Sequence, residues 1–139
     1  MANALWPTFK QDLLDKLHDL NTDNIVAMLQ KAGNYTYSGS DHFVSAVTAG
    51  GATVARSGTL ASPTIASGVF DTADFTWTAV ATTTACAQII LENNNGNSAA
   101  SDAARMLIAF YDTGMTGMPV TPNGGDINVT VNASGWFSL

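Results

Sequence analysis

Residues 74–80 read DFTWTAV and carry the clearest strand pattern in the chain. The aromatic or small side chains of Phe75, Trp77 and Ala79 alternate with threonine or valine. A period of two built from aromatic and β-branched residues predicts a β-strand with one face packed inward. We therefore expect a mainly β domain, and the segments on both sides fit that expectation.

Further short apolar runs are separated by turn residues and are predicted to be strands. They are residues 25–29, 42–47 (a short strand or a helical turn), 53–56, 60–65, 85–92, 105–111, 127–131 and 136–139. The runs at 85–92 and 105–111 are apolar on both faces, which predicts burial on both faces. Pro63 confines its own run to an edge or a bend because proline cannot donate to a ladder.

Residues 4–20 are predicted to form the one helix. Leu5, Phe9, Leu13 and Leu17 recur every four residues, as on one face of a helix. Pro7 is tolerated only in the first turn, so regular helix should begin near it. We expect a β-sandwich or small barrel of about seven to eight short strands with one N-terminal α-helix. Residues 1–139 would form a single domain, with the helix at 4–20 and the β-sandwich at 25–139.

Charge is scarce in this sequence. Charged residues make up 12% of the 139 residues, about half the usual share, and the net charge is −6. Such a surface fits a protein that is covered by a partner or by other copies, and it fits an ordinary neutral β-domain equally well. The cations outside the first 31 residues are Arg56 and Arg105. No basic patch is expected, so binding to nucleic acid or to an anionic membrane is not predicted.

The single cysteine, Cys86, excludes an intramolecular disulfide. It lies in an apolar run without a neighbouring cation, so an inert buried thiol is expected. Residues 1–10 lack the pattern of a secretory signal, and no apolar window reaches transmembrane length. We expect the protein to be made and folded in a cytosol.

The histidines do not predict a metal or catalytic site. His18 and His42 lie far apart, and neither has a cysteine or carboxylate at metal-ligand spacing. Asp41 next to His42 could be part of a triad, but no nucleophile elbow completes it. We expect His18 to lie on the predicted helix, and Asp41 and His42 to be solvated loop residues.

Carboxylates offer two weaker candidates. Asp71 and Asp74 could contribute to a calcium site, although turn capping is the better interpretation because the EF-hand pattern is absent. Glu92 and Asp112 end two strand candidates and could form an acid–base pair if the fold brought them together. No catalytic, cofactor or metal residue is predicted, and an enzyme is not expected.

Residues 118–127 read MPVTPNGGDI, a rigid turned connector with two prolines and two adjacent glycines. Together with residues 1–10 (MANALWPTFK), 69–80 (VFDTADFTWTAV) and 107–114 (LIAFYDTG), this string resembles a group of small virion proteins of tailed bacteriophages and prophages. The resemblance covers nearly the whole length. Residues 25–31 lack the acidic ending expected there, and the loop at 93–104 is longer and richer in asparagine than expected.

The resemblance implies a virion structural protein that is made in the host cytoplasm. Our leading hypothesis is a capsid decoration (cement) protein that binds and stabilises the assembled head shell, with the major capsid protein and further copies of itself as partners. Aromatic residues are common interface anchors, and we expect Trp6, Phe9, Trp136 and Phe137 to supply the contact. No cofactor is expected.

Two alternatives remain open. One is a tail, collar or fibre-associated virion protein that binds a receptor. The other is a carbohydrate-binding or carbohydrate-active protein, which would need exposed aromatic rings near carboxylates, such as Tyr35 or Tyr37 with Asp41.

Overall fold

The computed structural model describes residues 3–94 and 101–139. Within these residues, ten strands form three sheets, accompanied by two short α-helices, and no sheet closes into a barrel. The mainly β, sandwich-like fold is therefore confirmed. Residues 95–100 of the asparagine-rich loop expected at 93–104 lie outside the described residues.

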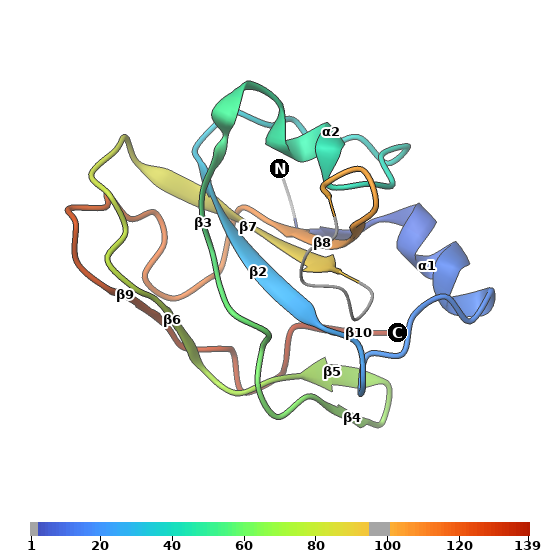
Figure 1. Ribbon diagram of the computed structural model, residues 1–139. Coiled ribbons are helices and arrows are strands. Elements are labelled where there is room, and N and C mark those ends of the chain that lie inside the picture. The colour runs from blue at the N-terminus through green and yellow to red at the C-terminus, as the bar shows by residue number, and fades with distance from the viewer. Residues whose placement is uncertain (1–2, 95–100) are drawn as a thin grey trace.

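The main sheet is antiparallel and has the order β1-β8-β7-β2-β3 (Figure 1). Its strands are β1 (Ala4–Leu5), β8 (Met106–Tyr111), β7 (Cys86–Asn93), β2 (Ile25–Lys31) and β3 (Thr53–Arg56). The three central strands are buried along nearly their whole length. Burial on both faces explains why residues 85–92 and 105–111 are apolar without alternation.

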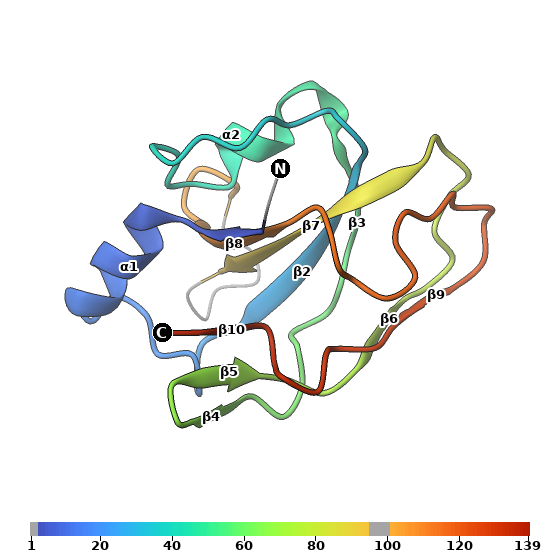
Figure 2. The ribbon, with the colours of Figure 1, turned by 180° about the vertical axis from the view of Figure 1, so that it is seen from behind.

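Two smaller sheets complete the fold. One has the order β10-β5-β4, with β10 (Phe137–Ser138), β5 (Val69–Asp71) and β4 (Thr64–Ala66); the other pairs β6 (Phe75–Trp77) with β9 (Ile127–Val129). Figures 1 and 2 both place the β4–β5 hairpin at the end of the molecule opposite helix α2 (Ser45–Thr48). The run at 42–47 thus contributes mainly a helical turn.

The predicted strand at 74–80 is shorter in the structure. Trp77 points inward, is fully buried, and donates its indole N–H to the Ala27 carbonyl over 3.1 Å. Ladder pairing stops after Trp77, and Ala79 has a φ of 47°. The predicted alternation holds for Phe75 and Trp77, but it reverses at the end, where Ala79 is exposed and Val80 is buried. The strand ends early because the chain turns at Ala79 to meet the connector.

The predicted range of the helix, 4–20, is too long at both ends, although regular helix begins at Pro7 as the proline predicted. Helix α1 covers Pro7–Leu14, and Ala4 and Leu5 pair with Phe110 and Ala109 as β1. The residue before a proline is driven out of the helical region, so the chain stays extended up to Pro7. At the other end, Lys16 takes a φ of 61°, which stops the helix.

The connector at 118–127 is held at both ends by backbone hydrogen bonds. Val120 and Cys86 exchange two such bonds, of 2.7 and 2.8 Å. Further along, Val80 donates to the carbonyl of Gly125 over 2.9 Å and accepts from the N–H of Gly124 over 2.8 Å. The connector therefore links the start of β7 to the end of the β6 segment before the chain enters β9.

Candidate functional site

The predicted interface aromatics are mostly core residues. Trp6 and Phe9 have no exposed surface, Trp136 is 6% exposed, and Phe137 is partly buried. Both indole N–H groups have internal partners: Trp6 donates to the Ser38 carbonyl over 3.0 Å, and Trp136 donates to Thr72 Oγ1 over 2.9 Å. The expectation that these residues form an exposed contact is wrong for Trp6, Phe9 and Trp136, because the fold itself buries their surface.

An apolar groove of about 450 Å³ lies beside Phe137. Phe70 and Phe137 contact each other there, with ring centroids 5.4 Å apart. The remaining lining residues are Leu13, Lys16, His18, Asp19, Leu20, Ile65, Gly68 and Leu139. We call this feature the apolar groove; it joins the segment after α1 to the sheet β10-β5-β4.

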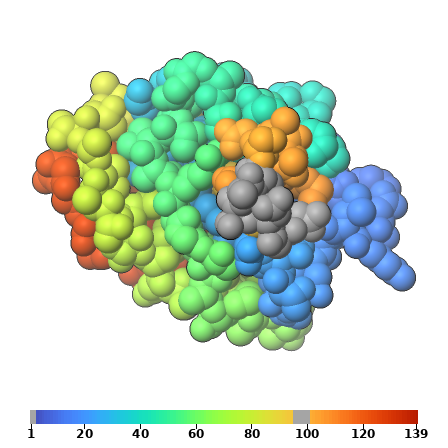
Figure 3. All heavy atoms as spheres, in the orientation of Figure 1, coloured from blue at the N-terminus to red at the C-terminus, as the bar shows by residue number. Residues whose placement is uncertain are grey.

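Large apolar side chains are exposed at and near this end of the molecule. Leu139 is 67% exposed and Ile65 is 49% exposed, and both line the apolar groove. Leu14 is 80% exposed and Leu17 is 51% exposed. The N-terminal segment to which Leu14 and Leu17 belong projects from the body of the molecule as the dark blue region in Figure 3. Exposed apolar side chains that line a groove, as Leu139 and Ile65 do, are typical of a binding surface.

The structure brings both histidines onto one buried carboxylate, Asp12 of α1. His42 Nε2 donates to Asp12 Oδ2 over 2.6 Å, and His18 Nε2 lies 3.6 Å from the same oxygen. Asp12 is 4% exposed and the His18 side chain is fully buried. The expectation that His42 is a solvated loop residue is therefore wrong, and two histidines that lie far apart in the sequence share one carboxylate. No spacing in the sequence indicates this cluster, because Asp12 and His42 are 30 residues apart.

His18 is held from its other side by Asn93. The Asn93 amide donates over 2.7 Å both to His18 Nδ1 and to Asp23 Oδ2. Nδ1 is then an acceptor, so the proton of the neutral ring lies on Nε2, facing Asp12. Burial lowers the pKa of His18 despite the nearby carboxylates of Asp12 and Asp23. This cluster holds the chain after α1 against the end of β7.

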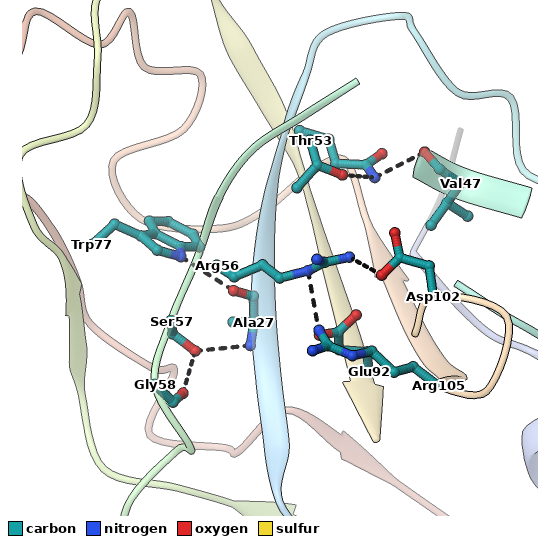
Figure 4. Close-up of polar contacts among 11 residues, drawn as sticks. Ala27, Val47, Thr53, Arg56, Ser57, Gly58, Trp77, Glu92, Asp102 and Arg105 are labelled. Carbon is teal, nitrogen blue, oxygen red and sulfur yellow. Dashed lines mark hydrogen bonds and ion pairs between the residues drawn. The ribbon is translucent and has the colours of Figure 1, made fainter. Parts of the chain in front are cut away.

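A second buried cluster gathers both arginines of the chain around Glu92 (Figure 4). Arg105 donates to Glu92 Oε1 over 2.9 Å, and Arg56 Nε lies 3.4 Å from the same oxygen. Arg56 also donates to Asp102 Oδ1 over 2.7 Å. Since β2 lies between β3 and β7, the Arg56 side chain spans a whole strand to reach Glu92.

Burial dominates the electrostatics of Glu92. Its side chain has no exposed surface, and desolvation raises its pKa against the opposing effect of Arg56 and Arg105. Glu92 Oε2 accepts no hydrogen bond from the described residues. Both arginines are committed to carboxylates, so neither contributes to a free basic patch. We interpret this cluster as a clamp on the main sheet.

The carboxylate pair considered from the sequence does not form. Glu92 lies opposite Leu107, and Asp112 follows five residues later, which separates the two acids by about 17 Å along the strand. Asp71 accepts from the Thr72 N–H over 2.8 Å, as expected for a turn cap. Asp74 instead accepts from the N–H of Val131 over 2.9 Å and so ties β6 to the segment after β9.

An aromatic hollow of about 420 Å³ lies over the other end of β7 and β8. Tyr35 and Tyr37 line it, together with Gln88 and Asp112. Tyr35 donates its hydroxyl to Asp41 Oδ2 over 2.7 Å, so this tyrosine and carboxylate do meet. Gln88 is 7% exposed, and its Oε1 accepts no hydrogen bond from the part of the chain that the structure describes. We call this feature the aromatic hollow.

Cys86 is fully buried, and desolvation raises its pKa above the usual thiol value. The burial was expected, but a neighbouring cation was not: Lys31 lies opposite Cys86 and acts to lower this pKa, and desolvation outweighs it. Across residues 3–94 and 101–139, no three histidine, cysteine or acidic side chains are grouped so that they could hold a metal ion. No helix in the same residues has the length and apolar character needed to cross a membrane.

Comparison with known proteins identified no relative of this chain. Neither the family models, nor the curated proteins, nor the solved structures contain a match to this chain.

Proposed function

We propose that this chain is a bacteriophage virion structural protein of the capsid decoration type, which binds the assembled head shell and stabilises it. Its partners would be the major capsid protein and further copies of itself, and it would act without catalysis. The sequence resemblance to small phage virion proteins is the observation that carries the proposal. A ligand that binds only the assembled state stabilises that state by mass action.

The arrangement of the resembling stretches supports the proposal. The stretch at 1–10 supplies β1, which pairs with β8 in the stretch at 107–114. The stretch at 69–80 supplies β6, which pairs with β9 directly after the connector. The stretches that carry the resemblance are therefore paired parts of one scaffold, as expected for a family defined by architecture.

The surface also supports a binding role. Leu14, the last residue of α1, and Leu17, just beyond it, are exposed on a protein whose charged residues are few. Because Trp6, Phe9 and Trp136 are buried, we place the capsid contact on Leu14 and Leu17 instead. Burying a leucine side chain that was exposed contributes about 1.5–3 kcal/mol.

Co-sedimentation tests this proposal. Purified protein is mixed with undecorated capsids and, separately, with isolated tails, and each particle is pelleted. We expect wild-type protein to pellet with capsids and to raise their unfolding temperature, and we expect the double variant Leu14→Ser, Leu17→Ser to lose both effects. A matched control replaces two exposed threonines away from this surface, Thr59→Ser and Thr130→Ser, and should bind like wild type. Absence of capsid binding alongside tight binding to tails would overturn the decoration role.

A second candidate function is favoured by the aromatic hollow. Tyrosine rings can pack on the C–H face of a sugar, while Gln88 Oε1 and the Asp112 carboxylate could accept hydrogen bonds from its hydroxyls. This arrangement would suit a receptor-binding tail or fibre-associated protein, the alternative raised by the sequence.

Calorimetric titration with host surface polysaccharide tests the second candidate. Asp112→Asn should weaken binding by roughly 10-fold, because a hydrogen bond to a charged acceptor is lost. Asp15→Asn, which removes an exposed carboxylate at the end of α1, serves as the control. If wild-type protein binds no polysaccharide, the receptor-binding candidate is rejected and the decoration proposal is unaffected.

A further inference from the structure

Strand β4 presents an open edge. It is the outermost strand of the sheet β10-β5-β4, and its residues Thr64, Ile65 and Ala66 are all exposed. Figures 1 and 2 show it at the margin of the molecule, with no other element beyond it. An uncovered strand edge is a template for pairing with another chain.

The backbone of Ile65 points out of this edge. Ile65 lies directly opposite Phe70 of β5, and the Phe70 carbonyl accepts from the Trp136 N–H over 2.8 Å on the β10 side. In an antiparallel ladder, the N–H and C=O of one residue point to the same side of the strand. When two directly opposite residues do not form hydrogen bonds with each other, the backbone groups of each residue point away from the partner strand. The N–H and C=O of Ile65 therefore face away from β5 and are available for a new strand.

The hairpin turn gives the same register independently. Ser67 and Gly68 have φ values of 51° and 78°, the conformation of a two-residue turn with positive φ at both positions. Such a turn makes its flanking residues, Ala66 and Val69, the first hydrogen-bonded pair. Ile65, one residue further, then belongs to a pair that is not hydrogen-bonded within the sheet.

Charge points to a second copy as the occupant. Residues 57–70 contain no charged side chain, although the protein carries a net charge of −6. Two β4 strands that pair with each other therefore place no like charges directly opposite one another. Antiparallel pairing about a two-fold axis would set Ile65 opposite Ile65 of the second copy, and Thr64 opposite its Ala66, so the edge is complementary to itself.

We propose that two copies of this chain dimerise through β4, antiparallel and two-fold symmetric about Ile65. The small sheets, with three strands from each copy, join into one continuous sheet. Two backbone hydrogen bonds form between the Ile65 residues, and their half-exposed side chains cover each other across the axis. The apolar groove, with Leu139 exposed in its lining, borders the same contact. This inference does not depend on where in a virion the protein acts.

Sedimentation velocity over a range of concentrations tests the dimer. Wild-type protein should pass from monomer to dimer as its concentration rises. Ile65→Lys places two like charges side by side across the axis and should raise the dissociation constant by at least roughly 100-fold. Thr130→Lys adds the same charge at an exposed position after β9 and should change the constant by less than about twofold. Circular dichroism confirms that both variants are folded.

Amide hydrogen exchange on the wild-type protein gives a second readout that needs no variant. Exchange at the Ile65 N–H should slow as concentration rises, because only the dimer provides its acceptor. Exchange at the Ala66 N–H, which is bonded within the hairpin, should be slow at every concentration. A wild-type protein that stays monomeric up to about 1 mM, or a dimer that Ile65→Lys leaves intact, would overturn the inference. Neither result would bear on capsid binding.

Discussion

At the residue scale, the adjacent side chains of Glu92 and Asn93 organise the polar interior. Glu92 holds Arg56 and Arg105, while Asn93 bridges His18 and Asp23. Both side chains are fully buried at the end of β7. Two polar clusters therefore depend on neighbouring residues of one strand, and substitutions there have separable consequences.

Removing the charge of Glu92 should destabilise the fold strongly. Glu92→Gln leaves Arg56 and Arg105 partly buried without their shared carboxylate, and the expected cost is about 3 kcal/mol of unfolding free energy. Urea unfolding at neutral pH measures it. Asp102→Asn, at a side chain that is 33% exposed, should cost less than about 1 kcal/mol. Equal effects of the two substitutions would contradict the clamp.

His18 should make stability depend on pH. Because burial lowers its pKa in the folded state, the unfolded chain binds the proton more readily, so stability falls as the pH drops below about 6.5. The loss from this group can reach about 1.4 kcal/mol for each pH unit. Urea midpoints between pH 7.5 and 5.5 should therefore fall more steeply for wild type than for His18→Gln. Parallel slopes would show that His18 is not the responsible group.

At the element scale, close backbone approach at Gly135 determines how the segment before β10 joins β5. A Cβ at Gly135 would come within 2.6 Å of both the Phe70 carbonyl oxygen and Val69 Cγ1. Gly135 has a φ of 77°, and Gly33 has a similar φ of 72°, but a Cβ at Gly33 would meet nothing within 4 Å. Comparing substitutions at Gly135 and Gly33 therefore distinguishes the cost of steric crowding from the cost of a left-handed backbone.

Alanine at these two glycines should therefore have different effects. Gly33→Ala should cost about 1 kcal/mol, the penalty for a left-handed backbone with a side chain. Gly135→Ala adds the clash with β5 and should cost at least about 3 kcal/mol in total. Chemical denaturation of both variants measures the difference. A similar cost for the two would mean that β10 moves away from β5 freely.

At the scale of the whole molecule, the surface is acidic and poor in charge, and its arginines are paired internally. Arg56 and Arg105 bind Glu92, and the lysines are confined to the first 31 residues. A protein of this kind has no stripe of cations to neutralise a phosphate backbone. This is consistent with the proposed decoration role, which would hold the protein on the outside of a particle and away from packaged nucleic acid.

DNA binding should accordingly be absent. In gel-shift experiments with double-stranded DNA at about 50 mM salt, where electrostatic binding is strongest, we expect no retardation at micromolar protein. A basic DNA-binding domain of similar size provides the positive control. A shift that weakened with added salt would contradict the charge argument and the assignment of both arginines to the clamp.

Local sequence patterns by themselves determined that this protein is mainly β and which of its strands are buried. The strand at Thr53–Arg56 was predicted with its observed bounds, and the apolar runs around Ile89 and Ile108 predicted the buried centre of the main sheet. These predictions succeed because alternation and apolar runs report burial directly. Pro7 correctly marked the start of regular helix, but the helix was predicted too long at its other end because a four-residue apolar repeat cannot show that Lys16 takes a left-handed backbone conformation.

Only the tertiary structure decided what the polar and aromatic residues do. Asp12, His18 and His42 meet because α1 and the segment before α2 pack together, and Arg56 reaches Glu92 because β2 separates their strands by one position. Trp6 and Trp136 are core residues because other elements of the fold cover their side chains, and a local sequence pattern cannot show which elements will do so. Sequence specifies the period of each segment, whereas contacts between residues 30 or more apart depend on how the segments are stacked.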